Sequence, residues 1–405
     1  MSRTLFTGGR VFDGTGVDPM TADVVVDGGR IVDVGTGLDG DTSVDLAGAT
    51  LLPGFFDCHV HVTISTLDRL TIAHTPFSYQ FYLAEQNLGR TLDAGITSVR
   101  DAGGADLGIA QALADGLIRG PRTQIALSML SQTGGHGDDM LPSGCSVPLL
   151  APHPGRPSTI VDGPDEMRRK VRELIRSGAN VLKVATSGGV LSPRDDPRHG
   201  HFRDEEIAVL VEEATAAGLF VMAHAQAADG IKVAVRNGVR SIEHGIYLDD
   251  EGIGMMLEHG TWLVPTLAAP RAVIDAVDAG VPLTPAVVEK ARMVIDQHTH
   301  AVRRAVGAGV KVAMGTDSGV GPHGDNLREI ALMVDCGMSP AQALRATTLS
   351  AAELLGVDAD LGSVAPGKRA DLVVVDGDPY DVGSLRERIR SVYQDGQLVA
   401  GRADG

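Results

Sequence analysis

The middle of the chain alternates between short apolar runs and longer amphipathic segments, and this alternation restricts the possible folds more than any other feature. The apolar runs have the length of strands that are buried on both faces, as in a parallel sheet. Most segments between them show a helical pattern that ends in glycine just before the next run, as a helix C-cap would. Eight such units in about 300 residues predict an α/β fold of the (β/α)8 or TIM barrel type. The eight runs are residues 51–57, 96–101, 123–129, 180–186, 219–224, 240–244, 261–267 and 310–316.

The alternative architecture is an open, doubly wound sheet. That architecture predicts a glycine-rich fingerprint directly after the first strand. The residues that follow the first run read "DCHVHVTIS" and contain no such fingerprint. The pattern therefore favours the barrel.

The two ends of the chain show a different pattern. Residues 3–50 consist of short β-branched runs separated by Gly and Asp, which is typical of β-hairpins. The same pattern returns only in "GSVAPGKRADLVVVDGDPY" and "IRSVYQDGQLVAGR". We therefore predict a barrel domain over residues 53–358 and a small β-sandwich domain built from residues 1–52 and 359–405. The Gly- and Pro-rich stretch 130–163 is expected to be a loop over the mouth of the barrel.

Composition argues against several classes of protein. The 405 residues carry a formal net charge of −17 and no Lys/Arg-rich patch, which disfavours a nucleic-acid surface. Three scattered cysteines, Cys58, Cys145 and Cys336, offer neither a disulfide framework nor a paired-cysteine zinc site and favour a reducing compartment. The sequence opens without an apolar signal region and contains no long apolar stretch. We expect a cytoplasmic protein with no membrane or nucleic-acid partner.

Polar residues interrupt the predicted strands mainly at their C-terminal ends, which is where barrel enzymes build their active sites. In "FDCHVHV", which overlaps the end of the first run, two histidines lie at i and i+2 and therefore point to the same face of a strand. The other polar residues of this kind occur singly, in or after the third, fourth, fifth, sixth and eighth apolar runs. Because these strand ends converge in a barrel, the whole set can surround one point. The set is His59, His61, His136, Lys183, His224, His244 and Asp317.

Each of these residues has an ordinary structural explanation when it is taken alone. A single histidine that closes a strand is more often structural than a ligand, and Asp317 in "GTDSG" could cap a helix. Taken together, imidazole and carboxylate groups suit zinc and similar divalent ions. Unpaired polar groups crowded at a barrel mouth would otherwise cost several kcal/mol in desolvation. The set therefore predicts a metal site.

Lys183 needs a separate explanation, because an ammonium group repels a divalent cation. Burial lowers the pKa of a lysine and makes its neutral amine accessible. A neutral amine can take up carbon dioxide as a carbamate, an anion whose two oxygens can bridge two metal ions. The alternative is a buried lysine paired with a carboxylate.

Five short motifs in chain order resemble the amidohydrolase superfamily: "PGFFDCHVH", "VLKVATSGG", "AHAQ", "IEHG" and "GTDSG". The closing "LGSVAPGKRADLVVVDGDP" resembles the return of that superfamily to its β domain, so the resemblance covers almost the whole chain. "SGGVLSPRDDPRHGHF" and "QTGGHGD" resemble loops of the imidazolonepropionase-like branch, which includes metal-dependent Xaa-Pro dipeptidases, lysine/arginine carboxypeptidases and ochratoxin-hydrolysing amidases. Members with one metal lack a lysine equivalent to Lys183, so the resemblance implies a binuclear centre.

The resemblance also implies which residues bind the two divalent ions, most simply Zn²⁺. One ion would be bound by His59, His61 and Asp317. The second would be bound by His224 and His244. Lys183, as N6-carboxylysine, would bridge both ions.

Two further residues match positions that contact substrate in related proteins. His136 matches a histidine near the substrate carbonyl, and Tyr247, in "EHGIYL", matches a residue that holds a substrate carboxylate. The stretch "RHGHF" departs from the family pattern because it contains two extra histidines, His199 and His201. We expect both of these to be solvated rather than to contact substrate.

The reaction that the resemblance implies is hydrolysis of an amide bond by a hydroxide shared between the two ions. Asp317 would carry the proton to the leaving amine, and His136 would help to stabilise the oxyanion. The expected substrate is a dipeptide or N-acyl amino acid. A urea, carbamate, lactam or ochratoxin-like amide remains an alternative, because the hydroxide attacks any carbonyl carbon.

A non-catalytic assembly protein that has lost its metals is the alternative from another class. Such a protein should show substitutions among the ligands, and all six are present in this chain. Fold-level analogy alone suggests a homo-oligomer.

Overall fold

Two parallel sheets form the centre of the computed structural model, which describes residues 3–141, 143–192 and 194–401. Their strands are β8 (Phe55–Val60), β9 (Ile96–Asp101), β10 (Arg122–Ile125), β11 (Met129–Leu130), β12 (Leu182–Ala185), β13 (Val221–Ala225), β14 (Ser241–His244) and β15 (Trp262–Val264). One sheet has the order β10-β9-β8 and the other the order β11-β12-β13-β14-β15. Successive strands are therefore neighbours in space, as repeated βα units require.

The first predicted strand, 51–57, is divided between two sheets. Residues up to Pro53 belong to β7 (Ala49–Pro53), which pairs with strands from the chain ends, and β8 begins at Phe55. Gly54 lies between them, and a Cβ atom at this position would lie 2.1 Å from Thr97 Oγ1. The prediction of one strand over 51–57 is therefore wrong, because the chain passes β9 too closely for any side chain and changes sheet there.

The third predicted strand, 123–129, is also divided. Leu127, between β10 and β11, has a φ of +66°, which is uncommon for a residue with a side chain. The chain changes sheet there, since β10 pairs with β9 and β11 pairs with β12. The second, fourth, fifth, sixth and seventh runs coincide with β9, β12, β13, β14 and β15 to within three residues at either end.

The eighth predicted strand, 310–316, is not a regular strand in the described part of the chain. Its segment instead makes isolated parallel bridges to both sheets, from Val312 to Leu263 in β15 and from Ser318 to Val60 in β8. Asp317, with a φ of +62°, departs from strand geometry at the end of this segment. The regular-strand prediction is therefore wrong for 310–316, although the segment lies where an eighth strand would lie.

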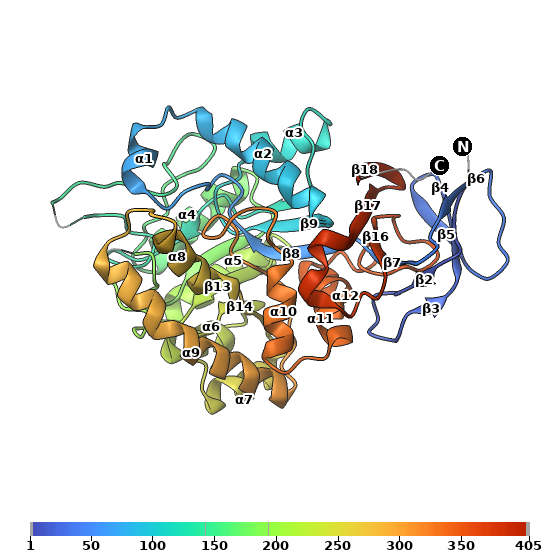
Figure 1. Cartoon of the computed structure of the whole chain (residues 1–405). Helices are drawn as coiled ribbons and strands as arrows, with labels where there is room; N and C mark the ends of the chain where they lie inside the picture. The colour runs from blue at the N-terminus through green and yellow to red at the C-terminus, as the bar shows by residue number, and fades with distance from the viewer. Residues whose placement is uncertain (1–2, 142, 193, 402–405) are drawn as a thin grey trace.

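Helices surround the parallel sheets in a mixed α/β arrangement (Figure 1). The helix over Pro164–Arg176 shows why they form: proline opens it, Asp165 and Glu166 lie in its first turn, and its apolar residues recur on one buried face. The helices are α1 (Arg69–His74), α2 (Tyr79–Asp93), α3 (Leu107–Ala114), α4 (Pro164–Arg176), α5 (Asp204–Ala216), α6 (Ala228–Arg236), α7 (Asp250–His259), α8 (Ala268–Asp278), α9 (Pro285–Ala308), α10 (Arg328–Asp335), α11 (Pro340–Thr347) and α12 (Leu349–Leu355), with short 3-10 turns at Val382–Ser384 and Arg386–Arg388.

The remaining strands form two sheets at the right of Figure 1. They are β1 (Thr4–Thr7), β2 (Arg10–Val11), β3 (Met20–Thr21), β4 (Asp23–Asp27), β5 (Arg30–Gly35), β6 (Thr42–Asp45), β7, β16 (Leu372–Asp376), β17 (Ile389–Gln394) and β18 (Gln397–Gly401). One sheet has the order β5-β4-β1-β6, and the other the order β18-β17-β16-β7-β2-β3. Strands from both ends of the chain therefore share one sheet, and Phe6 packs edge-on against Tyr393 in a core of their own.

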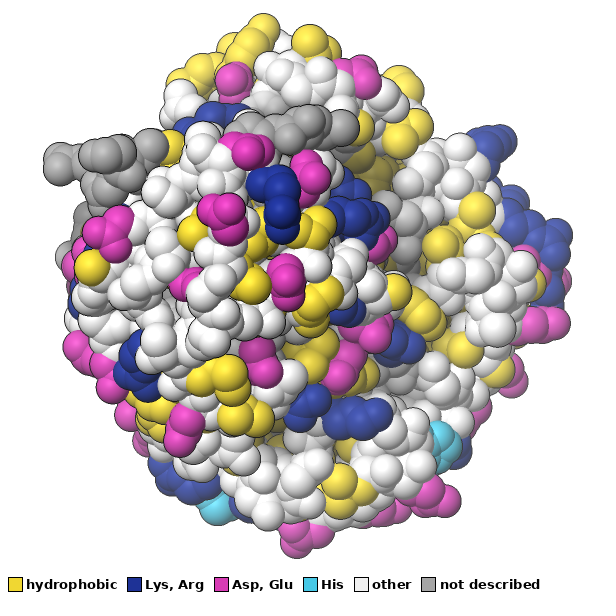
Figure 2. Space-filling model, turned by 90° about the vertical axis from the view of Figure 1, so that its right-hand side faces the viewer, with side chains coloured by type: hydrophobic (Ala, Val, Ile, Leu, Met, Phe, Trp, Pro, Cys, Tyr) yellow, Lys and Arg dark blue, Asp and Glu magenta, His cyan; other side chains and the backbone are white. Residues whose placement is uncertain are grey.

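No helix in the described ranges is long and apolar enough to span a bilayer. On the face drawn in Figure 2, acidic and basic side chains are interspersed, so neither sign of charge dominates that face despite the net charge of −17.

Candidate metal centre

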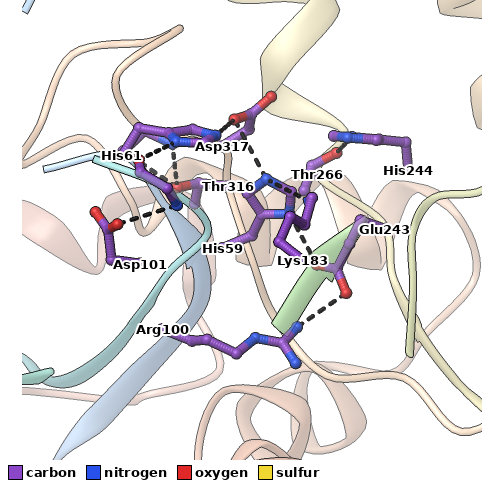
Figure 3. A network of polar contacts seen from close by, with 12 residues as sticks. His59, His61, Arg100, Asp101, Lys183, Glu243, His244, Thr266, Thr316 and Asp317 are labelled. Carbon is purple, nitrogen blue, oxygen red and sulfur yellow. Dashed lines mark hydrogen bonds and ion pairs between the residues drawn. The ribbon is translucent and has the colours of Figure 1, made fainter. Parts of the chain in front are cut away.

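The two histidines of the "HVH" motif lie at the carboxyl end of β8 and face Asp317 (Figure 3). His59 Nε2 lies 3.5 Å from Asp317 Oδ1, and His61 Nε2 lies 3.3 Å from the same oxygen. Asp317 comes from the segment that bridges β15 and β8, and its backbone N–H donates to His59 O at 2.7 Å. His59 and Asp317 are 258 positions apart in sequence but lie in one cluster.

The other predicted ligands line the same cavity, which has a volume of about 260 Å³. Lys183 Nζ lies 3.4 Å from His59 Nε2. The ring of His244 lies 5.1 Å from that of His59 and 4.6 Å from that of His224, between ring centroids. The structure therefore brings all six predicted ligands to one cavity, and ligand atoms of His59, His244 and Asp317 lie within 4.8 Å of one another.

In His59 and His61, the Nδ1 nitrogen makes a hydrogen bond away from Asp317, and this bond determines where the ring carries its proton. His59 Nδ1 is 2.8 Å from Glu243 Oε2, and His61 Nδ1 is 2.6 Å from Gly103 O. Both partners can only accept, so each Nδ1 carries a proton, and in the neutral form of each ring Nε2 carries the lone pair.

His244 is held in the same way. Its Nδ1 lies 2.6 Å from Thr266 Oγ1, and the single proton of that hydroxyl is donated to Pro265 O at 2.7 Å. Thr266 therefore accepts from His244 Nδ1–H, which leaves a lone pair on Nε2.

This arrangement tests whether the residues fit a divalent ion. The Nε2 atoms of two imidazoles face a carboxylate oxygen of Asp317 that is buried and receives no hydrogen bond. When both rings are neutral, these three acceptors repel one another, and a cation among them would satisfy all three. The donor set of imidazole and carboxylate therefore fits zinc or a similar ion.

Electrostatics differ among the predicted ligands. Burial alone would lower the pKa of His61, but the hydrogen bond and charge of Asp317 raise it above the usual value for histidine. Burial lowers the pKa of His59, His224 and His244 well below the usual value for histidine, so these rings are neutral. Burial also lowers the pKa of Lys183 to about 8, which makes the uncharged amine accessible near neutral pH. Both effects are what metal binding and carbamate formation require.

A buried ion pair behind the cavity was not predicted from the sequence. Glu243 accepts from His59 on one oxygen, and on the other it accepts from Arg100 Nη2 at 2.9 Å and from Ser241 Oγ (Figure 3). Arg100 Nε also donates to Cys58 O at 2.7 Å. A charged residue in the middle of each of the apolar runs "ITSVRD" and "SIEH" was the only sequence signal for this pair.

Asp57 is a second buried acid that sequence reasoning missed. It accepts from Thr316 Oγ1 at 2.6 Å, from Asn326 Nδ2 at 2.7 Å and from the backbone of His59 at 3.1 Å. These bonds tie β8 to the segment that carries Asp317, so Asp57 fixes the distance between two proposed ligands.

The residues predicted to contact substrate have different positions. His136 lines the cavity, and its ring stacks on that of His224 with centroids 4.1 Å apart. Tyr247 is not among the described residues that line the cavity. It packs, half-buried, against a hydrophobic cluster that includes Ile246 and Val190. His199 is exposed, as expected, but His201 is buried, so the expectation that it is solvated is wrong. Its backbone N–H donates to Thr186 O at 2.7 Å, which draws the residue inward.

Fold and cavity together define a mixed α/β protein with a histidine-rich site at the carboxyl ends of parallel strands. Residues 50–403 match the Amidohydrolase family, and the chain belongs to it. It is a hydrolase that acts on C–N bonds, as the motifs predicted.

Relatives support this assignment over nearly the whole chain. The chain is 36% identical over 374 residues to ochratoxinase from Aspergillus niger, a match that covers 88% of this chain and 76% of that protein. The crystal structure of a Xaa-Pro dipeptidase with bound methionine in its active site is similar with a TM-score of 0.90 and 34% identity, over 99% of this chain and 100% of that one. A prolidase complexed with N-methylphosphonate-L-proline gives a TM-score of 0.91 and 36% identity, with the same coverage.

Proposed function

We propose that this protein is a binuclear metal-dependent amidohydrolase that releases an amino acid from a dipeptide or N-acyl amino acid. The observation that carries the proposal is the convergence of the His59 and His61 Nε2 atoms on a buried Asp317 oxygen that receives no hydrogen bond. The names of the similar Xaa-Pro dipeptidase and prolidase structures support the choice of substrate class.

His59, His61 and Asp317 would hold one divalent ion, and His224 and His244 the other. Lys183, which has a lowered pKa and approaches His59, would act as the bridging N6-carboxylysine. Zn²⁺ matches this donor set most simply. When bound, two such ions lower the pKa of water and polarise a carbonyl.

The protein's own residues supply orientation and proton transfer. The Asp317 carboxylate faces the cavity, so its oxygen can accept a proton during attack and deliver it to the leaving amine nitrogen. The ring of His136 stacks on that of His224 and lines the same cavity as Asp317, so it can orient the substrate carbonyl. Tyr247 stays a prediction as a ligand for the substrate carboxylate.

We also infer that the two parallel sheets form one closed (β/α)8 barrel and that the chain ends form a composite β-sandwich domain. Closure is supported by the segment 310–318, which bonds to β15 through Ala313 N (3.0 Å) and to β8 through Met314 O (2.9 Å). The composite domain is supported by the antiparallel pairing of β7 with β16.

The proposal is tested by counting metal ions per chain and by screening dipeptides, N-acyl amino acids, ureas and carbamates with and without added zinc. We expect two ions per chain and release of a C-terminal amino acid that depends on zinc. His244→Asn should lose both, whereas His259→Asn, at an exposed position in α7, should lose neither. Hydrolysis of ureas or carbamates but of no dipeptide or N-acyl amino acid would contradict the proposed substrate class.

A further inference from the structure

The chain after β12 approaches the cavity and is held there by a lysine from a distant helix. We call residues 187–192 and 194–202 the β12 loop. Given the proposed function, we propose that Lys290 and Asp195 are positioning residues that hold His136 against His224 through this loop. Neither residue lines the cavity among the described residues, so any effect on catalysis must pass through others.

Lys290, in α9, places its ammonium group inside the β12 loop. Its Nζ donates to Gly189 O at 2.8 Å, to Ser192 O at 2.9 Å and to Asp195 O at 3.0 Å. The ammonium group has three N–H donors and the loop offers three carbonyl acceptors, so every donor has a hydrogen bond. The β12 loop is thereby folded around Lys290 Nζ. The side chain is only 14% exposed, which limits competition from water.

Asp195 connects this closed loop to the histidine. Its carboxylate accepts from Gly189 N at 3.0 Å and from the Ser192 hydroxyl, and it lies 3.5 Å from His136 Nδ1. His136 Nδ1 lies 2.9 Å from Ser192 Oγ. Since the Ser192 proton goes to Asp195, the serine oxygen accepts from His136 Nδ1–H. Nε2, the other ring nitrogen of His136, faces away from Ser192.

The loop backbone is shaped to the histidine ring. A Cβ atom at Gly189 would lie 2.2 Å from His136 Cε1, so no other residue fits beside the ring at this position. On the other face of the ring, His136 stacks on His224 with an angle of 16° between the planes. His136 is therefore enclosed between a proposed metal ligand and the loop that Lys290 organises.

Two substitutions separate this role from general support of the fold. Lys290→Met removes the ammonium, and Ser192→Ala removes only the hydroxyl between His136 and Asp195. Lys232→Met is a matched control, because Lys232 is 17% exposed and pairs with Asp249 (2.7 Å) and Glu251 (2.6 Å) at a site outside the cavity.

The first measurement needs no substrate. In zinc-loaded protein, Lys290→Met should keep the wild-type metal content and show faster hydrogen exchange at β12 loop amides, whereas Lys232→Met should leave that exchange unchanged. Wild-type exchange in Lys290→Met, or loss of its metal, would overturn the proposal. If the wild-type protein hydrolyses no amide, the proposed function fails while this measurement still tests the positioning role.

The second measurement is a double-mutant cycle. Turnover should fall about 10- to 100-fold in Lys290→Met and in Ser192→Ala, as outer-shell losses typically do. Combined with His136→Ala, neither substitution should reduce turnover further, because both act through the missing ring. Multiplicative losses in the double variants would show that Lys290 and Ser192 act independently of His136 and would overturn the proposal.

Discussion

Glu243→Gln gives the sharpest test of how the metal site is built. The substitution preserves size but replaces one carboxylate oxygen by an NH2 group. Glu243 accepts hydrogen bonds on both oxygens, from His59 on one side and from Arg100 and Ser241 on the other. A glutamine can satisfy only one side, because its NH2 group would face another donor.

The structure sets the size of the effect. Glu243 and Arg100 are both buried, with side chains 0% and 2% exposed, so Arg100 would keep a charge without its partner. Breaking a buried pair from one side costs about 3–5 kcal/mol of folding free energy. If the amide NH2 faces His59, that ring must move its proton to Nε2 and loses the lone pair aimed at Asp317. Loss of such an outer-shell bond lowers metal affinity about 10- to 100-fold.

Both effects can be measured separately. Urea unfolding of metal-free protein gives the change in folding free energy, and competition with a chromophoric chelator gives the change in zinc affinity. Glu251→Gln is the control, because Glu251 pairs with Lys232 at the surface with its side chain 71% exposed. Wild-type zinc affinity together with wild-type folding free energy in Glu243→Gln would refute the view that this carboxylate holds both His59 and Arg100.

Three further predictions concern the site and its surroundings. Asp317→Asn should retain part of the bound metal yet lower turnover by about 10²- to 10⁴-fold, the usual contribution of a proton-transfer group; near-wild-type kcat would remove Asp317 from that role. Lys183→Ala should lose activity and at least one metal ion per chain by elemental analysis, with partial recovery on addition of formate or acetate; a variant that keeps two ions and full activity would contradict a bridging carbamate. Burial raises the pKa of Glu329 from its usual 4.5 to about 8, so its contribution to stability is complete below about pH 4.5 and is lost as the pH rises toward 8. Urea midpoints of Glu329→Gln should lack this decline, and parallel pH profiles for both proteins would count against the raised pKa.

The convergence of the six candidate residues on one cavity could be predicted because it depends on local rules. His59 and His61 share a face because side chains alternate along a strand, and the single residues His224 and His244 end neighbouring parallel strands. These rules act within a few residues of each ligand, so the sequence carries them directly. Membership of the amidohydrolase superfamily could be predicted for the same reason, from motifs in order.

The supporting contacts could not be predicted, because they depend on how distant segments meet. Glu243 reaches His59 across 184 positions, and Asn326 reaches Asp57 across 269. In a single sequence, a charge inside an apolar run looks like an anomaly rather than half of a pair. The strand errors have a similar origin, since only the close approach of Thr97 shows why Gly54 ends one sheet and begins another.

The backbone at the site explains why these distant contacts matter. His244 and Asp317 both have positive φ, +72° and +62°, and such conformations cost about 1–3 kcal/mol each for residues with side chains. Each is held by a hydrogen bond to another part of the protein: His244 by its Nδ1 to Thr266, and Asp317 by its N–H to His59 O. Since those bonds do not involve an ion, the strained positions of both residues are set by the protein itself. The fold thus directs these side chains through contacts of its own, and the outer partners of His59, His61 and His244 each hold the Nδ1 nitrogen of the ring.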